Sequence, residues 1–188
     1  MLDDLNVDYR DPQFQKGRSL EMLHGYQRET IDRMHESGSL ALLLDPGLGK
    51  TVTCLTHFYE LFSSCAVERA LIVAPLRVMK STWPAEIASW KGVSGLTHHV
   101  LHGAKAWKDA ERIHGAHITL VNPEGLERMV KESKTLPSYD VVYFDESTYF
   151  KSASSKRTKA ALKMAHKING GIPHRFILTG TPRPNGVE

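Results

Sequence analysis

The segment LDPGLGKT, residues 44–51, combines residue types that bind phosphate. The full phosphate-loop pattern is Gly-x-x-x-x-Gly-Lys-Ser/Thr, and Leu44 stands here at its first position. The end of the pattern is complete, because Gly49, Lys50 and Thr51 follow in order. Glycines let successive backbone N–H groups face an anion, a lysine adds positive charge, and a threonine hydroxyl can ligate magnesium. The segment is therefore a candidate phosphate site, and the alternative is a strand–turn–helix joint with an accidental Gly-Lys-Thr.

A pair of carboxylates, Asp145 and Glu146, directly follows the apolar run VVYF. At the end of a strand, the first carboxylate can hold magnesium through water and the second can polarise an attacking water. An acidic pair after a strand is a weak signal alone. It becomes a strong one when it follows a phosphate loop in the same domain.

Strand and helix patterns alternate along the chain and would position these residues. Helical periodicity covers residues 26–36 and is closed by Gly38. Apolar runs such as ALIVA, HITLV and DVVYF are typical of parallel strands that helices cover on both faces. The pattern therefore predicts an α/β fold with a mostly parallel sheet, within the single domain expected for 188 residues. The expected strands lie near residues 40–44, 70–74, 97–101, 117–121, 140–144 and 175–179.

In such sheets, ligands bind at the carboxyl ends of the strands. Five of the expected strands run into polar, turn-forming segments, which supports a site at that edge. These segments are DPGLGKT, PLRVMKSTW, NPEGL, DESTYFK and TGTPRPN.

Positive charge gathers near the end of the chain, although the net charge is only +3. From residue 147 onward the acids are confined to Glu188. A solvated lysine-rich helix and a nucleic-acid surface are alternative explanations. The basic residues there are Lys151, Lys156, Arg157, Lys159, Lys163, Lys167, Arg175 and Arg183.

The sequence argues against membrane and secretory classes, and against a metal site built from cysteines or histidines. It has no apolar run that could span a bilayer, and its polar, acidic start is unlike a secretion signal. Cys54 and Cys65 have no paired spacing, so we expect free thiols in a cytoplasmic protein without membrane contact. Strand alternation sends His98 and His99 to opposite faces, and the histidines show no metal-ligand spacing.

Several motifs together resemble those of superfamily 2 helicases and translocases, closest to the Swi/Snf-like branch and its bacteriophage members. They are Tyr26-Gln27, DPGLGKT, LIVAPLRVMKSTWPAEIASW, DESTYFKSASSKRTKAALK and LTGTPRPN, in matching order from about residue 20 to the end. The resemblance implies a RecA-like phosphate-loop domain over residues 19–188, with residues 1–18 as an extension. ATP and Mg²⁺ would be its cofactors.

Roles for single residues follow from the same resemblance. Gln27 would contact adenine, Thr51 and Asp145 would hold magnesium, and Asp145, Glu146 and Lys50 would be catalytic. Thr179-Gly180-Thr181 would couple the ATP site to nucleic acid. The nucleotide-binding set would be Gln27, Gly47, Leu48, Gly49, Lys50, Thr51 and Val52.

Two positions depart from the family's motifs. Leu44, at the first position of the loop, matters less, because the loop of this superfamily closes with the later glycines. The acidic motif reads Asp-Glu-Ser-Thr and lacks the usual histidine, which leaves Thr148 as the polar relay.

The resemblance also places DNA contacts in PLRVMKSTW and NPEGL, which follow the expected strands near residues 70–74 and 117–121, with Arg183 following the last expected strand. It implies backbone contacts by four residues, and hence weak sequence preference. Trp83 fits either a DNA contact or the core, whereas Trp90 is expected in the core. The four predicted contacts are Arg77, Lys80, Asn122 and Arg183.

Two functions of different classes are compatible with these motifs. The first is an ATP-driven translocase domain, and the second is a non-catalytic ATP- or DNA-binding module. The intact Lys50, Thr51, Asp145 and Glu146 favour the first. Because LTGTPRPN closes the first domain of similar motors, we expect a second RecA-like domain, in cis or in trans, to be required for turnover. A phosphate-loop kinase is disfavoured, because LTGTPRPN would have no role in one.

Overall fold

Among the residues that the structure describes, six strands form a central sheet in the order β1-β6-β5-β2-β4-β3. The structure, a computed structural model, describes residues 18–132, 135–166 and 172–180. All neighbouring strands pair in parallel, so both the α/β class and the parallel sheet are confirmed. Each strand lies within a residue or two of its expected position. The strands are β1 Ser39–Leu43, β2 Ala70–Val73, β3 His98–Val100, β4 Ile118–Val121, β5 Val141–Asp145 and β6 His174–Thr179.

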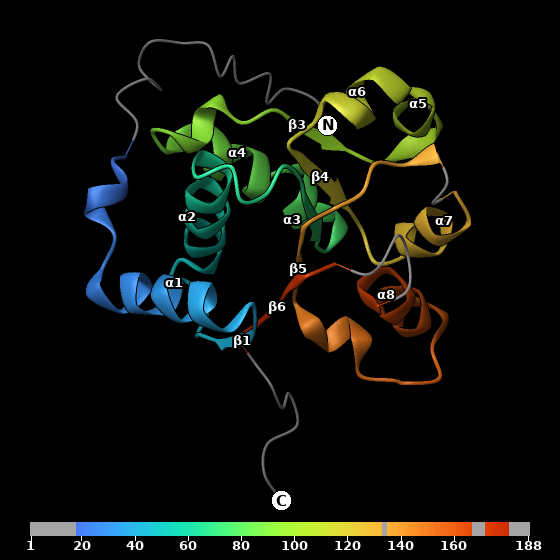
Figure 1. Cartoon of the computed structure of the whole chain (residues 1–188). Helices are drawn as coiled ribbons and strands as arrows, with labels where there is room; N and C mark the ends of the chain where they lie inside the picture. The colour runs from blue at the N-terminus through green and yellow to red at the C-terminus, as the bar shows by residue number, and fades with distance from the viewer. Residues whose placement is uncertain (1–17, 133–134, 167–171, 181–188) are drawn as a thin grey trace, which may run out of the picture.

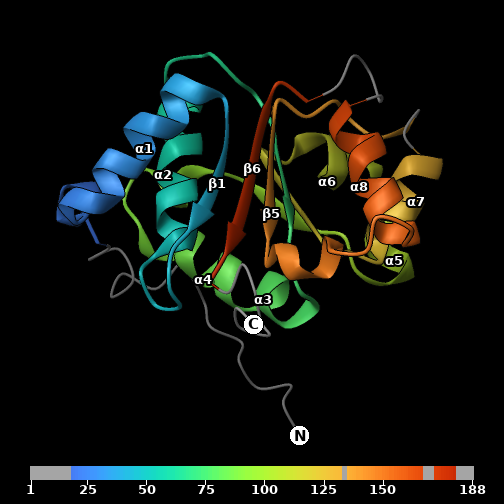
Figure 2. The ribbon, with the colours of Figure 1, turned by 90° about the horizontal axis from the view of Figure 1, so that it is seen from below.

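Helices cover both faces of the sheet and give three layers (Figures 1 and 2). One outer layer contains α1 (Gly25–Ser37), α2 (Lys50–Ser63), α3 (Leu76–Lys80) and α4 (Thr82–Ser89). The other contains α5 (Gly103–Lys108), α6 (Ala110–Gly115), α7 (Gly125–Lys131) and α8 (Lys156–His166). Short 3-10 turns join them at η1 Leu20–Met22, η2 Val93–Gly95 and η4 Ser147–Phe150.

The two-sided burial of the sheet explains its apolar strands. In β2, Ala70 and Ile72 pack with the α1/α2 layer, whereas Leu71 and Val73 pack with the α7/α8 layer. All four are fully buried. Burying a leucine, isoleucine or valine side chain contributes about 1.5–3 kcal/mol, so a polar residue at position 71, 72 or 73 would be strongly destabilising.

Helix α1 has defined ends that place its first turn beside the phosphate loop. The side chain of Gln27 accepts a 2.9 Å hydrogen bond from the backbone N–H of His24 and so caps the helix start. The helix ends at Gly38, whose φ of 62° is left-handed, as the sequence predicts.

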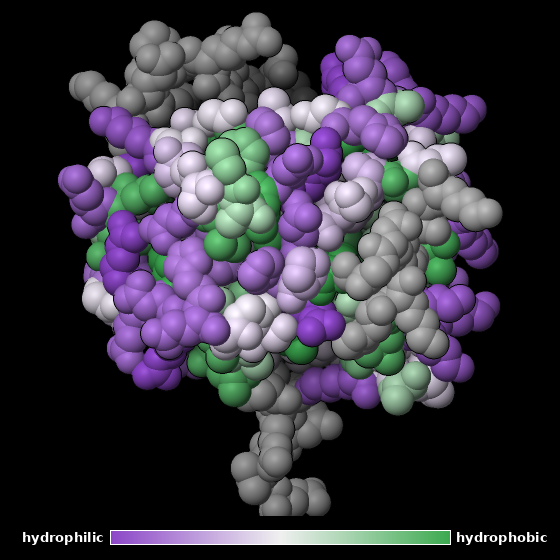
Figure 3. Space-filling model, viewed as in Figure 1, coloured by the Kyte–Doolittle hydropathy of each residue, from purple (hydrophilic) through white to green (hydrophobic). Residues whose placement is uncertain are grey.

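The backbone of Arg18 takes part in the fold. Its N–H donates to Ser89 O at 2.9 Å, and its carbonyl accepts from Lys91 N–H at 3.1 Å. The expected extension otherwise lies outside the described residues, and the boundary between residues 18 and 19 stays a prediction. On the face shown in Figure 3, hydrophilic residues predominate over α1 at the lower left. None of the helices among the described residues is long and apolar enough to cross a membrane.

Candidate nucleotide-binding site

The phosphate loop connects the end of β1 to the start of α2, as the sequence predicts. Gly47 and Gly49 have φ values of 87° and 73°, a left-handed conformation that favours glycine. Gly49 is the N-cap of α2, and no side chain among the described residues caps the helix. The first N–H groups of this 14-residue helix therefore face outward together with the positive end of its dipole. This arrangement suits a bound anion.

Lys50 lies within this loop. Its Nζ donates to the carbonyl oxygens of Leu44 at 2.6 Å and Asp45 at 3.0 Å. The bond to Leu44 uses a main-chain atom, so the leucine side chain in place of the pattern's first glycine does not prevent the loop from closing on the lysine.

A cavity of about 440 Å³ opens beside the loop. Its walls come from the loop, from the segment leading into α1, and from α4. Every predicted nucleotide-binding residue except Leu48 lines it. The lining residues are Arg18, Met22, His24, Tyr26, Gln27, Gly47, Gly49, Lys50, Thr51, Val52, Thr82, Glu86 and Trp90.

Gln27 is 5% exposed, and its amide is bonded on both sides. Its Oε1 accepts from His24, and its Nε2 donates to Leu48 O at 3.2 Å. Tyr26 OH donates to the same Leu48 carbonyl at 3.0 Å. A Cβ on Gly49 would collide with the Gln27 amide, which is a second reason for glycine there. The adenine contact of Gln27 stays a prediction, whereas its hold on the phosphate loop is a contact that the sequence did not indicate.

The acidic pair lies at the carboxyl end of β5. Oδ2 of Asp145 accepts a 3.0 Å hydrogen bond from Nε1 of Trp83. Burial raises the pKa of the Asp145 carboxyl above its usual value, while the Trp83 hydrogen bond and the nearby Lys50 charge oppose the rise. Glu146 has a left-handed φ of 58°, which is strained for a residue with a side chain. Its Oε1 accepts a 2.8 Å bond from Thr148 Oγ1.

Strand order brings the loop and the acidic pair together. β6 lies between β1 and β5, with Thr179 opposite Leu43 and Leu178 opposite Asp145. Gly180 follows directly and packs so closely on Pro46 that a Cβ there would fall 2.8 Å from Pro46 Cδ. The predicted coupling motif therefore contacts the phosphate loop through Gly180, while Thr179 pairs with the last residue of β1. Its third residue, Thr181, lies outside the described residues.

The residues present fit a magnesium–nucleotide complex. Thr51 lines the cavity and Asp145 is half-buried at the same sheet edge, so both predicted metal ligands supply oxygen. Oxygen ligands are those that Mg²⁺ prefers. The uncapped α2 terminus and the Lys50 ammonium supply the positive potential that phosphates require.

The predicted DNA contacts fall at three places. Arg77 and Lys80 are exposed on α3, which follows β2 at the same sheet edge as the phosphate loop. Asn122 is half-buried after β4, and its Nδ2 donates to Glu124 Oε2 at 2.6 Å. Arg183 lies outside the described residues.

Trp83, on α4, and Trp90, at the C-cap of α4, both belong to the core. Trp83 is 0% exposed and Trp90 is 6% exposed, which excludes direct base stacking by Trp83 in this conformation. Nε1 of Trp90 donates to Glu86 Oε2 at 2.7 Å.

Comparison with known proteins agrees with this geometry. The SNF2-related domain family matches residues 26–188. Protein p41 of Acyrthosiphon pisum secondary endosymbiont phage 1 is 36% identical over 86% of this chain and 36% of its own length. CHROMATIN REMODELING 24 of Arabidopsis thaliana is 26% identical over 98% of this chain and 17% of its own. The chain thus spans about a third or less of these relatives.

Solved structures show the same fold. The Sulfolobus solfataricus SWI2/SNF2 ATPase core in complex with dsDNA superposes with a TM-score of 0.71 at 23% identity, over 85% of this chain and 32% of that one. The UvsW helicase from bacteriophage T4 has a TM-score of 0.68 at 14% identity, over 86% of this chain and 54% of that one. With its fold, its motif order and the family match over residues 26–188, the chain belongs to the SNF2-related domain family.

Proposed function

We propose that this chain is the first RecA-like motor domain of a DNA-dependent ATPase that uses Mg-ATP for translocation. The observation that carries the proposal is the placement of β6 between the phosphate-loop strand and the acidic-pair strand, which lets Lys50 influence Asp145 electrostatically. The archaeal structural neighbour is described in complex with dsDNA, which supports DNA as the partner. The phage relative supports the cytoplasm of a bacterial or phage-infected cell.

Each residue has a role in this proposal. The uncapped N–H groups of α2 and the Lys50 ammonium bind the phosphates, and Gln27 contacts the adenine while it holds the loop. Thr51 and Asp145 hold Mg²⁺, which supplies charge neutralisation on the phosphate oxygens. Glu146 orients and polarises the attacking water, and Thr148 holds the Glu146 carboxylate through its 2.8 Å hydrogen bond.

A second RecA-like domain, in cis or in trans, completes the site in this proposal. Phosphoryl transfer gains roughly 10³–10⁵ in rate from an arginine that stabilises the transition-state charge. Among the described lining residues of the cavity, Arg18 is the one arginine, and it packs over the Trp90 ring with its guanidinium carbon 5.6 Å from the ring centroid. The arginine that completes the site would come from the second domain.

ATP hydrolysis with and without duplex DNA tests the proposal. We expect residues 1–188 to bind Mg-ATP loosely and to hydrolyse it negligibly. The two-domain protein, in which the second RecA-like domain is supplied in cis or in trans, should show DNA-stimulated hydrolysis that Glu146→Gln abolishes. The Glu146→Gln variant excludes a contaminating ATPase.

Two results would contradict this proposal. Robust, Glu146-dependent turnover by residues 1–188 would show that no second domain is needed. Failure of the two-domain protein to hydrolyse ATP would instead favour a non-catalytic nucleotide- or DNA-binding module.

A further inference from the structure

Trp83 is a fully buried tryptophan whose one polar atom is bonded to a site carboxylate. It lies on α4 in the core cluster beneath α1 and α2, with 0% of its surface exposed. Its Nε1–H donates to Oδ2 of Asp145 at 3.0 Å, across 62 positions of sequence. A buried indole N–H needs an acceptor, and here the acceptor is the carboxylate of a proposed magnesium ligand.

The helix that carries Trp83 also forms part of the nucleotide cavity. Thr82 and Glu86 of α4 line that cavity, so neighbouring positions of one helix contact the nucleotide space and the acidic pair. α4 follows α3 without an intervening loop, because Ser81 N–H donates to Arg77 O and Ser81 O accepts from Ala85 N–H, each at 3.1 Å. Trp83 is therefore held on a continuous stretch of helical backbone, with its own side chain buried.

An indole is well suited to orient a carboxylate for a metal. Its N–H donates and cannot accept, so it binds the ionised carboxylate and offers nothing to the cation itself. With Oδ2 held by Trp83, the Asp145 carboxylate is restrained relative to α4. Loss of a group that holds a metal ligand in this way typically lowers metal affinity by about 10–100-fold.

We propose that Trp83 is a positioning residue that orients Asp145 for magnesium in the nucleotide site. This inference rests on the proposed Mg-ATP function. It gives the buried Trp83 of α4 the role of holding the metal ligand Asp145, in place of a purely packing role or a base-stacking role.

A magnesium titration of nucleotide binding tests the inference in the 188-residue chain. ATP affinity is measured by calorimetry in EDTA and then at increasing Mg²⁺ for the wild type and for Trp83→Phe, which keeps a ring and loses the N–H. We expect equal affinity in EDTA and a requirement for about tenfold more Mg²⁺ in Trp83→Phe. Asp145→Asn provides the reference for a lost ligand.

Trp107→Phe is the matched control. Trp107 lies on α5 in the opposite layer, where its ring packs 4.4 Å from the Arg128 guanidinium carbon. The magnesium requirement of the Trp107→Phe variant should equal that of the wild type. An unchanged magnesium requirement in Trp83→Phe, with a changed one in Asp145→Asn, would overturn the inference and leave the proposed function standing. Absence of magnesium-dependent ATP binding in the wild type would instead overturn the proposed function.

A second measurement needs no folded Trp83 variant. The chain has three tryptophans, so a ¹⁵N-labelled sample gives three indole N–H resonances, which Trp90→Phe and Trp107→Phe assign by elimination. On addition of Mg²⁺ to the ATP-bound protein, the Trp83 resonance should shift and the Trp107 resonance should stay. A stationary Trp83 resonance during saturable magnesium binding would contradict a hydrogen bond to the ligand carboxylate.

Discussion

Lys50 Nζ donates a 2.6 Å hydrogen bond to the carbonyl oxygen of Leu44, six residues earlier at the first position of the phosphate-loop pattern. The lysine is thus held at the phosphate loop by backbone atoms, with its charge near Asp145. We predict that Lys50→Ala abolishes Mg-ATP binding while the fold persists, because the ammonium is the main side-chain contact to the phosphates and the carbonyls that it leaves can bind water. Calorimetry measures the affinity, and thermal unfolding checks the fold.

The exposed Lys159 on α8 offers a matched control, since Lys159→Ala removes the same charge away from the loop. Its ATP affinity should equal that of the wild type. An unchanged ATP affinity in folded Lys50→Ala would refute the phosphate-loop assignment.

The hydroxyl of Thr148 should matter for turnover more than for binding. Hydrogen bonds to charged groups contribute about 1.5–3 kcal/mol, so removing the bond that holds Glu146 should slow hydrolysis about tenfold or more. We predict this loss for Thr148→Val in the two-domain protein, with ATP affinity unchanged and Thr148→Ser nearly as active as the wild type. If Thr148→Val and Thr148→Ser are equally slow, the role of Thr148 is packing rather than hydrogen bonding.

DNA binding by this domain should be weak, nearly independent of sequence and steeply dependent on salt. Each lost phosphate contact reduces the slope of log affinity against log salt by about 0.7–0.9. Arg77→Ala and Lys80→Ala should each lower the slope by this amount. Fluorescence anisotropy at several salt concentrations provides the measurement.

Arg33→Ala serves as the control for the DNA prediction. Arg33 is exposed and paired with Glu29 at 2.6 Å in α1, whose end leads into the start of β1 at the opposite sheet edge. Its removal should leave the slope unchanged. Salt-independent affinity, or a strong preference for one base sequence, would contradict backbone recognition by Arg77 and Lys80.

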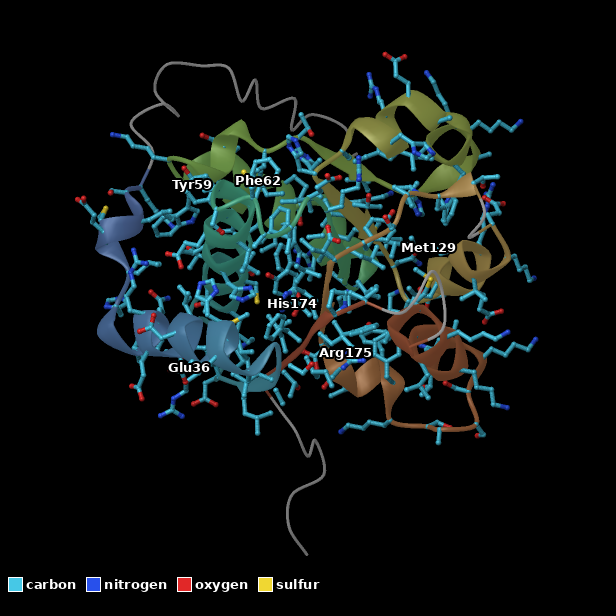
Figure 4. All side chains as sticks on the ribbon, viewed as in Figure 1. Glu36, Tyr59, Phe62, Met129, His174 and Arg175 are labelled. Carbon is cyan, nitrogen blue, oxygen red and sulfur yellow. The ribbon has the colours of Figure 1, made fainter. Side chains whose placement is uncertain are left out.

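A buried histidine should make stability depend on pH. Nδ1 of His57 lies 2.8 Å from Tyr143 OH, and burial, together with His35 and His174, lowers the pKa of His57 to about 3. Figure 4 shows His174 at the start of β6, close to α1 and α2. Between pH 6.5 and about 3, the unfolded chain binds a proton that the folded state excludes. The free energy of unfolding should therefore fall with decreasing pH, by up to about 1.4 kcal/mol per unit from this group.

Urea unfolding between pH 4 and 7 measures this contribution as a difference from His57→Gln. The variant should lose stability near pH 7, because Tyr143 loses its partner. The slope of its free energy of unfolding against pH should be smaller, by the amount that corresponds to about one proton. Equal slopes for the two proteins would show that His57 does not titrate on unfolding in this range.

The strands and the loop of the site could be predicted from the sequence, because each apolar run ends at turn-forming or charged residues. The order of the strands could not, since β6 pairs with β1 across 136 positions and nothing local encodes that choice. The burial pattern of β3, with His98 exposed and His99 buried, follows the predicted alternation.

Two side-chain roles depended on the packing of helices. An indole, which is an apolar ring with one N–H, suits either the core or a stacked base. The residue type therefore does not decide the place of Trp83, which depends on how α4 is rotated against β5. The Gln27 amide was predicted to contact adenine, but its bonds to His24 and Leu48 depend on how α1 meets the phosphate loop.

The position of β1 at the edge of the sheet has a consequence for biosynthesis. Among the described residues, β1 pairs with β6 alone, and β6 ends at Thr179. During translation, the strand that leads into the phosphate loop therefore stays without this neighbour until residues 174–179 have left the ribosome. Pairing of distant segments is slow, because the chain loses loop entropy before the contact forms. Ribosome-bound chains stopped before residue 174 should carry an exposed β1 that proteases and chaperones can reach, and the nucleotide site would be the last part of the domain to mature.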